Sequence, residues 1–247
     1  MSVITATADN VLTITLNRPE AGNALNGELG QAILDALASA ADDPEVRAVI
    51  LTGAGEKIFC AGMDLKAFAA GENIAPVGQA FVALREYGKP LIAAVNGQAL
   101  AGGFEVMMSC DLVVAAEHAR FGIPEVKRGL FAAGGGTRLP TRIPLAIALE
   151  MGLTGDPIDA QRALSLGLIN QVVPAAEVLT AAAALAARIT ANGPLAVQAT
   201  KKLMVSEIPP ADGSVAGEWY GRVFGSEDAK EGARAFAEKR PPVWKGR

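Results

Sequence analysis

Two glutamates stand beside glycine-rich segments, a setting in which a carboxylate can do chemistry. Glu105 lies three residues after Gly102 in the segment ALAGGFE, and Glu125 follows Pro124 in FGIPE. If a helix begins at Gly102, its first N–H groups have no partner within the helix and its dipole favours negative charge. Glu105 then projects on nearly the same side of that helix. One turn could therefore supply both a donor to an oxyanion and a base, although each glutamate taken alone is also typical of an ordinary helix start or turn.

Two more glycine-rich segments resemble the one before Glu105 in their setting. The first is FCAGMDL at residues 59–65, shortly after a run of apolar residues, and the second contains Gly134, Gly135 and Gly136. Small residues at the ends of strands allow close approach of the backbone, and their N–H groups can bind an anion. We therefore expect these segments to meet near the glutamates.

The residue types that are scarce exclude several other chemistries. The only histidine is His118, so a zinc site with histidine ligands and a Ser-His-Asp hydrolase both lack groups, and no G-x-S-x-G motif is present. Neither a P-loop nor a G-x-G-x-x-G motif occurs. Cys60 and Cys110 are not in C-x-x-C spacing and lie in apolar segments, which predicts buried, reduced thiols in a cytoplasmic protein. Carboxylate chemistry with backbone donors is what remains, without a metal.

Composition narrows the class of protein. The chain has 247 residues, of which 51% are hydrophobic and 19% charged, and this is typical of a globular protein. The net charge of -4 and the lack of a basic stripe argue against nucleic acid as a partner. The longest weakly polar stretch, residues 90–104, is too short and too interrupted by Asn96 and several glycines to span a membrane, and the alternating N-terminus does not read as a signal peptide.

The patterning of the first half predicts an α/β fold. Residues 3–7 and 11–17 alternate around Asp9 and Asn10, which indicates a hairpin, and Asn26 can cap a helix that runs to about residue 41. Apolar strands then alternate with helices, which implies a mainly parallel sheet covered on both faces. We expect strands at 46–52, 91–95 and 111–117, and helices near 76–87 and from 102.

From about residue 144 onward the pattern is helical, and only Val172 and Val173 resemble a strand. The alanine-rich stretch at 181–187 favours helix but offers little bulk for a core. No linker and no internal repeat separates the two halves, which indicates one α/β domain with a helical C-terminal part. The expected helices cover residues 145–152, 159–166, 175–190, 194–206, 212–223 and 226–239.

Taken together, these segments resemble the crotonase (enoyl-CoA hydratase/isomerase) family over nearly the whole chain. The resemblance runs in order from LNRPE at 16–20, through the three glycine-rich segments, to FAEKR at 236–240 and KGR at 245–247. It implies a ββα superhelix core over residues 1–190 and a helical trimerisation region over 191–247, as one continuous domain. It also implies a homotrimer or a dimer of trimers, a coenzyme A thioester as substrate and no separate cofactor, because coenzyme A is part of the substrate.

The resemblance also assigns roles to residues. The N–H groups of Met63 and Gly102 match the family's oxyanion hole, and Glu105 and Glu125 match the two glutamates of the hydratases, with the expected spacing of 20 residues. These glutamates would hold one water, with Glu105 as the base and Glu125 as the acid that protonates C2. The resemblance implies that the substrate is contacted by Ala61, Met63, Asp64, Leu65, Lys66 and Gly102.

Several positions depart from the family pattern. Ala21 and Gly22 stand where a basic residue commonly contacts the nucleotide. Lys66, and Lys239 and Arg240 from a neighbouring subunit, are therefore the candidates for that contact. Met63 replaces a common alanine and would reshape the acyl pocket. The segments at 125–130 and 139–148 resemble the branch related to carnitinyl-CoA dehydratase, which also includes hydratases of other acyl chains.

Two alternative functions stay open at this point. A Δ3,Δ2-enoyl-CoA isomerase uses the same scaffold but typically needs only one of the two carboxylates, so the presence of both favours a hydratase. A non-catalytic acyl-CoA-binding protein of this scaffold would be expected to lack at least one of the glutamates, and neither is lost. Decarboxylases, dehalogenases and thioester hydrolases of the family would need further groups near the site.

Overall fold

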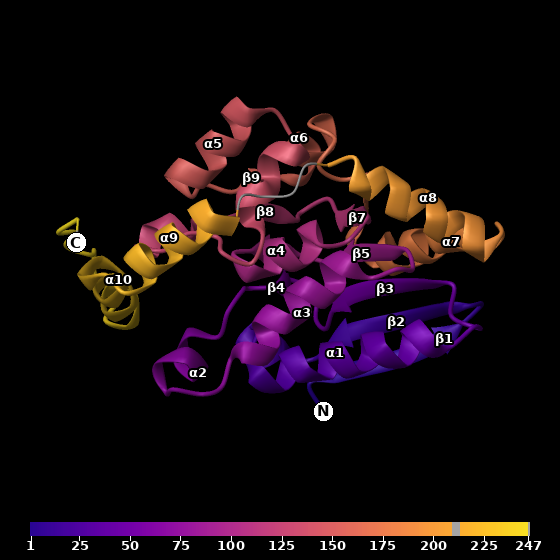
Figure 1. Cartoon of the computed structure of the whole chain (residues 1–247), viewed down its shortest axis with the longest axis horizontal. Helices are drawn as coiled ribbons and strands as arrows, with labels where there is room; N and C mark the ends of the chain where they lie inside the picture. The colour runs from indigo at the N-terminus through magenta and orange to yellow at the C-terminus, as the bar shows by residue number, and fades with distance from the viewer. Residues whose placement is uncertain (209–212, 247) are drawn as a thin grey trace.

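Strands rich in apolar side chains form the centre of a large, mainly parallel sheet. A computed structural model describes residues 1–208 and 213–246, apart from the side chain of Ala216. Within them, β1 pairs antiparallel with β2 and every other pair in this sheet is parallel (Figure 1). In spatial order, its six strands are β1 (Val3–Ala8), β2 (Val11–Leu16), β3 (Ala48–Gly53), β5 (Leu91–Val95), β7 (Leu112–Ala116) and β10 (Gln171–Val173).

The hairpin predicted at the N-terminus is confirmed. Its turn residues Asp9 and Asn10 have φ values of 50° and 62°, and the strands pair from Val3 with Leu16 to Ala8 with Val11. Positive φ at both turn positions matches the right-handed twist of the strands, and Asp and Asn tolerate that conformation better than most residues. The hairpin thereby places β2 beside β3.

A second, smaller sheet lies beside the first and was not predicted. Its described strands, in spatial order, are β4 (Ile58–Cys60), β6 (Gln98–Leu100), β8 (Arg120–Gly122) and β9 (Ile158–Asp159). Each of β4, β6 and β8 follows a strand of the large sheet by a few residues, so the chain repeats a strand–strand unit, as the ββα superhelix requires. Strands of two or three residues carry too little alternation to be recognised. The expectation that Val172 and Val173 form the only strand after residue 144 is therefore wrong, because β9 precedes them.

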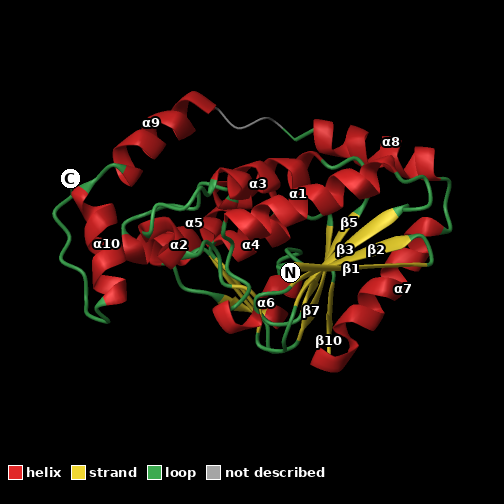
Figure 2. Ribbon diagram, turned by 90° about the horizontal axis from the view of Figure 1, so that it is seen from below, coloured by secondary structure: helices red, strands yellow, loops and turns green. Residues whose placement is uncertain are grey.

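Helices cover both faces of the large sheet, as predicted. Helices α1 (Gly27–Asp42) and α3 (Ala75–Glu86) pack together on one side, and α7 (Val178–Thr190) lies against β3, β5 and β7 on the other (Figure 2). Asn26 caps α1, because its Oδ1 accepts a hydrogen bond of 3.0 Å from the Leu29 N–H. Ala182 and Ala186 of α7 are fully buried, so the alanine-rich stretch allows this helix to approach the sheet closely.

The remaining helices lie at several places around the two sheets. The described C-terminal helices end at one extremity of the molecule, away from the large sheet (Figure 1). The helix expected at 212–223 begins outside the described residues at Asp212, and the described part runs from Gly213. These helices are α2 (Leu65–Ala69), α4 (Gly102–Met108), α5 (Leu145–Thr154), α6 (Ala160–Ser165), α8 (Pro194–Ser206), α9 (Gly213–Phe224) and α10 (Glu227–Ala237).

Candidate active site

Glu105 is buried in the first turn of α4 and is held by the glycine-rich loop. Only 5% of the residue is exposed, and its Oε1 accepts a hydrogen bond of 2.9 Å from the Gly136 N–H. The loop can come this close because it lacks side chains. A Cβ on Gly134 would lie 2.7 Å from Oε2 of Glu105, and one on Gly136 would lie 2.5 Å from the Cβ of Ala132. The glycines of this loop therefore serve to enclose a carboxylate.

Glu125 lies on a short 3-10 helix, η2 (Pro124–Arg128), immediately after β8. Its Oε2 is buried and has no hydrogen-bond partner in the described part of the chain. Burial, and then the charge of Glu105, raise the pKa of Glu125 to about 7, against a smaller opposing effect of Arg128. The segment before Glu125 also approaches the loop that binds Glu105, because a Cβ on Gly136 would lie 3.0 Å from Cγ2 of Ile123 and 3.3 Å from Oε1 of Glu105.

The two carboxyls differ in what surrounds them. Burial also raises the pKa of Glu105, but the N–H groups of Gly136, Gly134 and Gly135 oppose that rise because they stabilise its ionised form. Glu125 receives no comparable set of donors. The ionised form is therefore stabilised by more backbone donors at Glu105 than at Glu125. Neighbouring carboxyls whose surroundings differ in this way are suited to act as an acid and a base.

The N–H groups of Met63 and Gly102 lie close together. Met63 forms a short parallel bridge with Leu25, which uses the N–H groups of Leu25 and Asp64 and leaves that of Met63 outside the bridge bonds. Gly102 opens α4, where the first N–H groups have no acceptor within the helix. A Cβ on Gly102 would lie only 3.4 Å from the Met63 nitrogen. Two adjacent backbone donors can stabilise an oxyanion.

Three of the residues predicted to contact the substrate, Asp64, Leu65 and Lys66, directly follow Met63. Asp64 also stabilises the local structure. Its Oδ1 caps α2 by accepting from the N–H groups of Lys66 and Ala67 at 3.1 and 3.2 Å, and its Oδ2 accepts from Arg18 at 3.0 Å. Leu65 is half-buried and Lys66 is exposed. The segment is therefore anchored through Asp64, and the contacts of its members with substrate stay predictions.

Ala61, predicted to contact the substrate, and the nucleotide candidates Lys239 and Arg240 occupy different places. Ala61 is exposed beside Gly22, whose added Cβ would lie 3.4 Å from the Ala61 Cβ. Lys239 lies just beyond α10 with a φ of 53°. Arg240 is already paired within its own chain, because it donates to Glu231 at 2.6 Å and to Glu238 at 2.5 Å.

Sequence reasoning missed some residues that shape this site. Phe81 of α3 lies against the glycine loop, where a Cβ on Gly134 would meet its ring at 2.8 Å. The chain has 8 phenylalanines, and their spacing in the sequence does not indicate which of them lies at the site. The pairing of Arg18 with Asp64 was also missed, because it joins positions far apart in the sequence.

The groups excluded from chemistry by the sequence lie where they were expected. Burial raises the pKa of both Cys60 and Cys110 to about 12, so both are buried thiols rather than thiolates at neutral pH. His118 is exposed, with Nε2 3.1 Å from the carbonyl oxygen of Glu56. Among the described residues, no cluster of His, Cys, Asp and Glu could hold a metal ion, and no helix is long and apolar enough to cross a membrane.

Two neighbouring backbone donors, the buried Glu105 and the half-buried Glu125 make up an arrangement that can combine oxyanion stabilisation with acid–base catalysis. Comparison with known proteins gives the family. Residues 6–247 match the family model described as enoyl-CoA hydratase/isomerase, and the chain belongs to that family. Solved proteins of this family share the fold with a large and a small sheet that is described above.

Several relatives match over nearly their whole length. A carnitinyl-CoA dehydratase from Salmonella typhi is 44% identical over 250 residues, which cover 96% of this chain and 95% of the relative. A solved carnitinyl-CoA hydratase from Mycobacterium avium has a TM-score of 0.93 at 48% identity, covering 100% of this chain and 99% of that one. An enoyl-CoA hydratase from Mycobacterium tuberculosis has a TM-score of 0.78 at 49% identity, with the same coverage. The predicted fold class and the likeness to the carnitinyl-CoA dehydratase branch are thereby confirmed.

Proposed function

We propose that this protein is a hydro-lyase that adds water reversibly across the 2,3 double bond of a 2-enoyl-CoA thioester and gives a 3-hydroxyacyl-CoA. The observation that carries this proposal is the pair of buried carboxyls in unlike surroundings next to the N–H groups of Met63 and Gly102. Relatives named as hydratases and dehydratases, which match along the whole chain, support the same reaction.

In the proposed mechanism, the thioester carbonyl oxygen accepts hydrogen bonds from the N–H groups of Met63 and Gly102. Glu105, ionised, takes a proton from a water whose oxygen forms a bond to C3. The electrons of the double bond move towards the carbonyl, which becomes an enolate oxygen held by the two donors. Glu125, protonated, then delivers its proton to C2. One such donor contributes roughly 10²- to 10³-fold to the rate in comparable sites.

The proposed roles predict the pH dependence of hydration. Glu125 must carry a proton, so kcat/KM should fall as the pH rises through the Glu125 pKa of about 7. Glu105 must be ionised, and because burial raises its pKa, the loss of activity on the acid side should begin above the ordinary range of a glutamate. Initial rates of hydration against pH test this, and a rate that stays constant well above neutral pH would contradict the role of Glu125.

The principal alternative is isomerisation of a 3-enoyl to a 2-enoyl thioester. That reaction shuttles one proton between C2 and C4 and needs a single carboxylate, whereas this site encloses two. Acyl-CoA binding without catalysis is disfavoured for the same reason. A hydratase consumes the conjugated enoyl thioester, whereas an isomerase produces it, so the two reactions change the ultraviolet absorbance in opposite directions.

A panel of thioesters tests the proposed function and its substrate range. We expect 2-enoyl-CoA substrates to lose the absorbance of the conjugated thioester, and crotonobetainyl-CoA is included because relatives are named carnitinyl-CoA dehydratases. Crotonyl-CoA, a long-chain enoyl-CoA and a steroid side-chain thioester complete the panel. If no 2-enoyl thioester reacts while a 3-enoyl thioester gains the conjugated absorbance, the protein is an isomerase.

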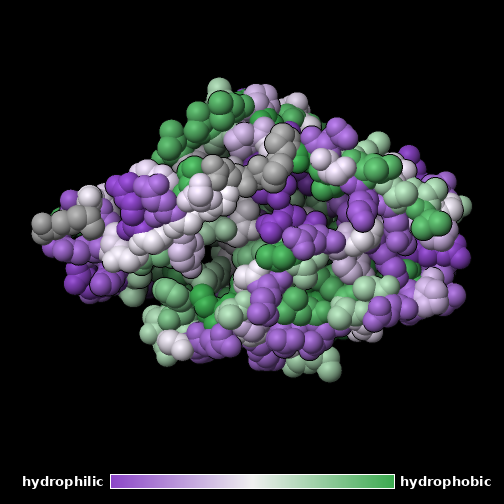
Figure 3. All heavy atoms as spheres, in the orientation of Figure 1, coloured by the Kyte–Doolittle hydropathy of each residue, from purple (hydrophilic) through white to green (hydrophobic). Residues whose placement is uncertain are grey.

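We further propose that the chain acts in the cytoplasm, needs no cofactor beyond the coenzyme A of its substrate, and forms a homotrimer or a dimer of trimers through residues 191–247. Apolar side chains exposed on the surface support association. Within 191–247, Leu203 and Met204 of α8 are 67 and 69% exposed, and Trp219 of α9 is 47% exposed. Outside this region, hydrophobic atoms also gather over α5 (Figure 3). Sedimentation at several concentrations measures the oligomeric state.

A further inference from the structure

Helix α10 lies directly on the turn that carries Glu125. A Cβ on Gly232 of α10 would lie 2.1 Å from the carbonyl oxygen of Arg128, the last residue of η2. A Cβ on Gly129, whose φ is +67°, would lie 2.7 Å from the carbonyl oxygen of Asp228. The backbones of the two elements are therefore in direct contact. Because no flexible side chain separates them at these glycines, a shift of α10 would also move η2.

A side-chain contact joins the same two elements. The guanidinium of Arg128 lies 4.4 Å from the centroid of the Phe236 ring, within the range of a cation–π interaction. Arg128 is also one of the groups that act on the charge of Glu125. Movement of α10 would therefore alter both the position and the electrostatic surroundings of that carboxyl.

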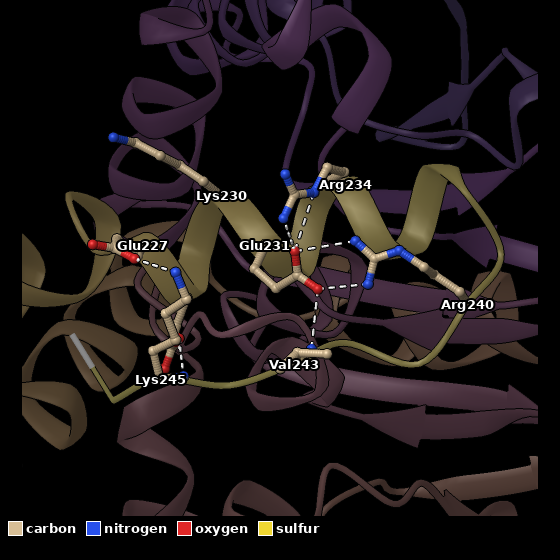
Figure 4. Close-up of a pocket in the computed structure, with 8 residues that line it drawn as sticks. Glu227, Lys230, Glu231, Arg234, Arg240, Val243 and Lys245 are labelled. Atoms are coloured by element: carbon tan, nitrogen blue, oxygen red, sulfur yellow. Dashed lines mark hydrogen bonds and ion pairs between the residues drawn. The ribbon is translucent and has the colours of Figure 1, made fainter.

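Glu231 holds α10 together with the C-terminal tail. The residue is only 7% exposed. Its carboxylate accepts hydrogen bonds from Arg234, from Nη1 and Nη2 of Arg240 at 2.6 and 3.1 Å, and from the Val243 N–H at 3.0 Å (Figure 4). Hydrogen bonds from Arg240 and Arg234 hold the pKa of Glu231 well below the usual range, so it stays ionised at neutral pH. One carboxylate thus ties the helix to a segment that follows its end.

The tail bound in this way returns to the Glu125 turn. Asp228 accepts from the N–H groups of Lys245 and Gly246 at 2.7 and 2.8 Å, so the tail lies along α10. Trp244 reaches Gly129, where an added Cβ would lie 3.1 Å from its ring. The turn is therefore enclosed by α10 and by Trp244, and Glu231 and Asp228 both bind the tail to that helix.

We propose that Glu231 is a positioning residue for Glu125, acting through α10, the C-terminal tail and η2. This proposal rests on the proposed function for its effect on catalysis. The Oε2 of Glu125 supports it, because this buried oxygen has no hydrogen-bond partner in the described part of the chain and the packing of its turn helps to locate it. Glu231 touches no reacting atom and belongs to an ion-pair cluster outside the candidate active site.

The titration of Glu125 tests this proposal without relying on activity. Carboxyl groups of 13C-labelled glutamate are followed by NMR, with Glu125→Gln used to assign the signal. The charges that act on Glu125 are Glu105 of α4 and Arg128 of its own turn. Helices α10 and α5 pack against η2, and their charged residues include Asp228, Glu231, Arg234 and Glu150. In Glu231→Gln we expect the midpoint for Glu125 to fall from about pH 7 towards the ordinary value, because a loosened turn admits water.

Kinetics supply the second readout. In Glu231→Gln we expect kcat for hydration to fall roughly 10- to 100-fold with little change in KM, because a small displacement of a catalytic group costs rate rather than binding. In a Glu125→Gln background the same substitution should change the residual kcat by less than about twofold, since the group it positions is gone. If Glu231 served stability alone, Glu231→Gln would lower Tm, and its effect on kcat would be the same in the wild-type and Glu125→Gln backgrounds.

Matched variants keep the test decisive. Glu238→Gln removes the exposed carboxylate that pairs with Arg240 and should behave as the wild type. Arg240→Gln removes two of the bonds to Glu231 and replaces Glu231→Gln if that variant does not fold. If the Glu125 midpoint is unchanged in both Glu231→Gln and Arg240→Gln, the proposal is overturned, whatever happens to Tm. If the wild type hydrates no enoyl thioester, the proposed function fails, and the NMR midpoint still decides the role of Glu231.

Discussion

Glu105→Gln and Glu125→Gln should each lower kcat for hydration by roughly 10²- to 10⁴-fold while binding of acyl-CoA survives. Glutamine has nearly the shape of glutamate but cannot take a proton from water or deliver one to C2. In Glu105→Gln, the Gly136 N–H keeps an acceptor in the amide oxygen, so the loop can stay in place. The loss is therefore expected in the chemical step. Stopped-flow absorbance and calorimetric titration with a saturated acyl-CoA separate the two effects.

Glu117→Gln is the matched control for both variants. Glu117 is exposed just after β7 and belongs to none of the groups assigned to the site, so the substitution should leave kcat and KM as they are. If either active-site variant kept near-normal rates, the assignment of the two glutamates to hydration would be wrong. Retained activity in Glu125→Gln with positional exchange of the double bond would instead indicate an isomerase.

Gly62→Ala should lower kcat strongly, because it acts on both proposed oxyanion donors at once. Gly62 has a φ of +98°, and an added Cβ would lie 2.8 Å from the Cβ of Ala101 and 2.9 Å from the nitrogen of Gly102. The methyl group must push Met63 and the start of α4 apart. Loss of one oxyanion donor costs roughly 10²- to 10³-fold in kcat in comparable enzymes, and we expect a loss of that order.

Gly71→Ala separates the effect of the contact from that of the backbone. Gly71 also has a positive φ, of +73°, but nothing lies within 4 Å of an added Cβ. It should therefore show the strain of an alanine in the left-handed region without losing kcat. Equal kcat values for the two alanine variants would argue against the N–H groups of Met63 and Gly102 as the oxyanion hole.

Much of the large sheet could be predicted from the sequence because its signals are local. The hairpin at Asp9 and Asn10 uses residues that tolerate positive φ, and the strands β3, β5 and β7 are apolar runs of five or six residues. The cap at Asn26 likewise depends on a residue and the helix next to it. In each case the pattern and the structure lie within one short segment.

The small sheet and the contacts that complete the site could not be predicted in this way. β4, β6 and β8 have three residues each, and what defines them is the neighbouring strand rather than their own pattern. Yet they bring Met63, Gly102 and Glu125 to one place. The spacing of Glu105 and Glu125 indicated their partnership only through family resemblance. Glu231 reads as an ordinary helical glutamate until the tail folds back onto it.

Hydration of a 2-enoyl thioester in 18O-labelled water tests the central claim most directly. If Glu105 activates a water that attacks C3, the 3-hydroxyacyl-CoA formed by the wild-type protein carries one 18O atom, and Glu105→Gln and Glu125→Gln form almost none over the same time. Mass spectrometry of the product gives the answer. A 3-enoyl thioester converted into a 2-enoyl thioester, with no label in any product, would contradict the account.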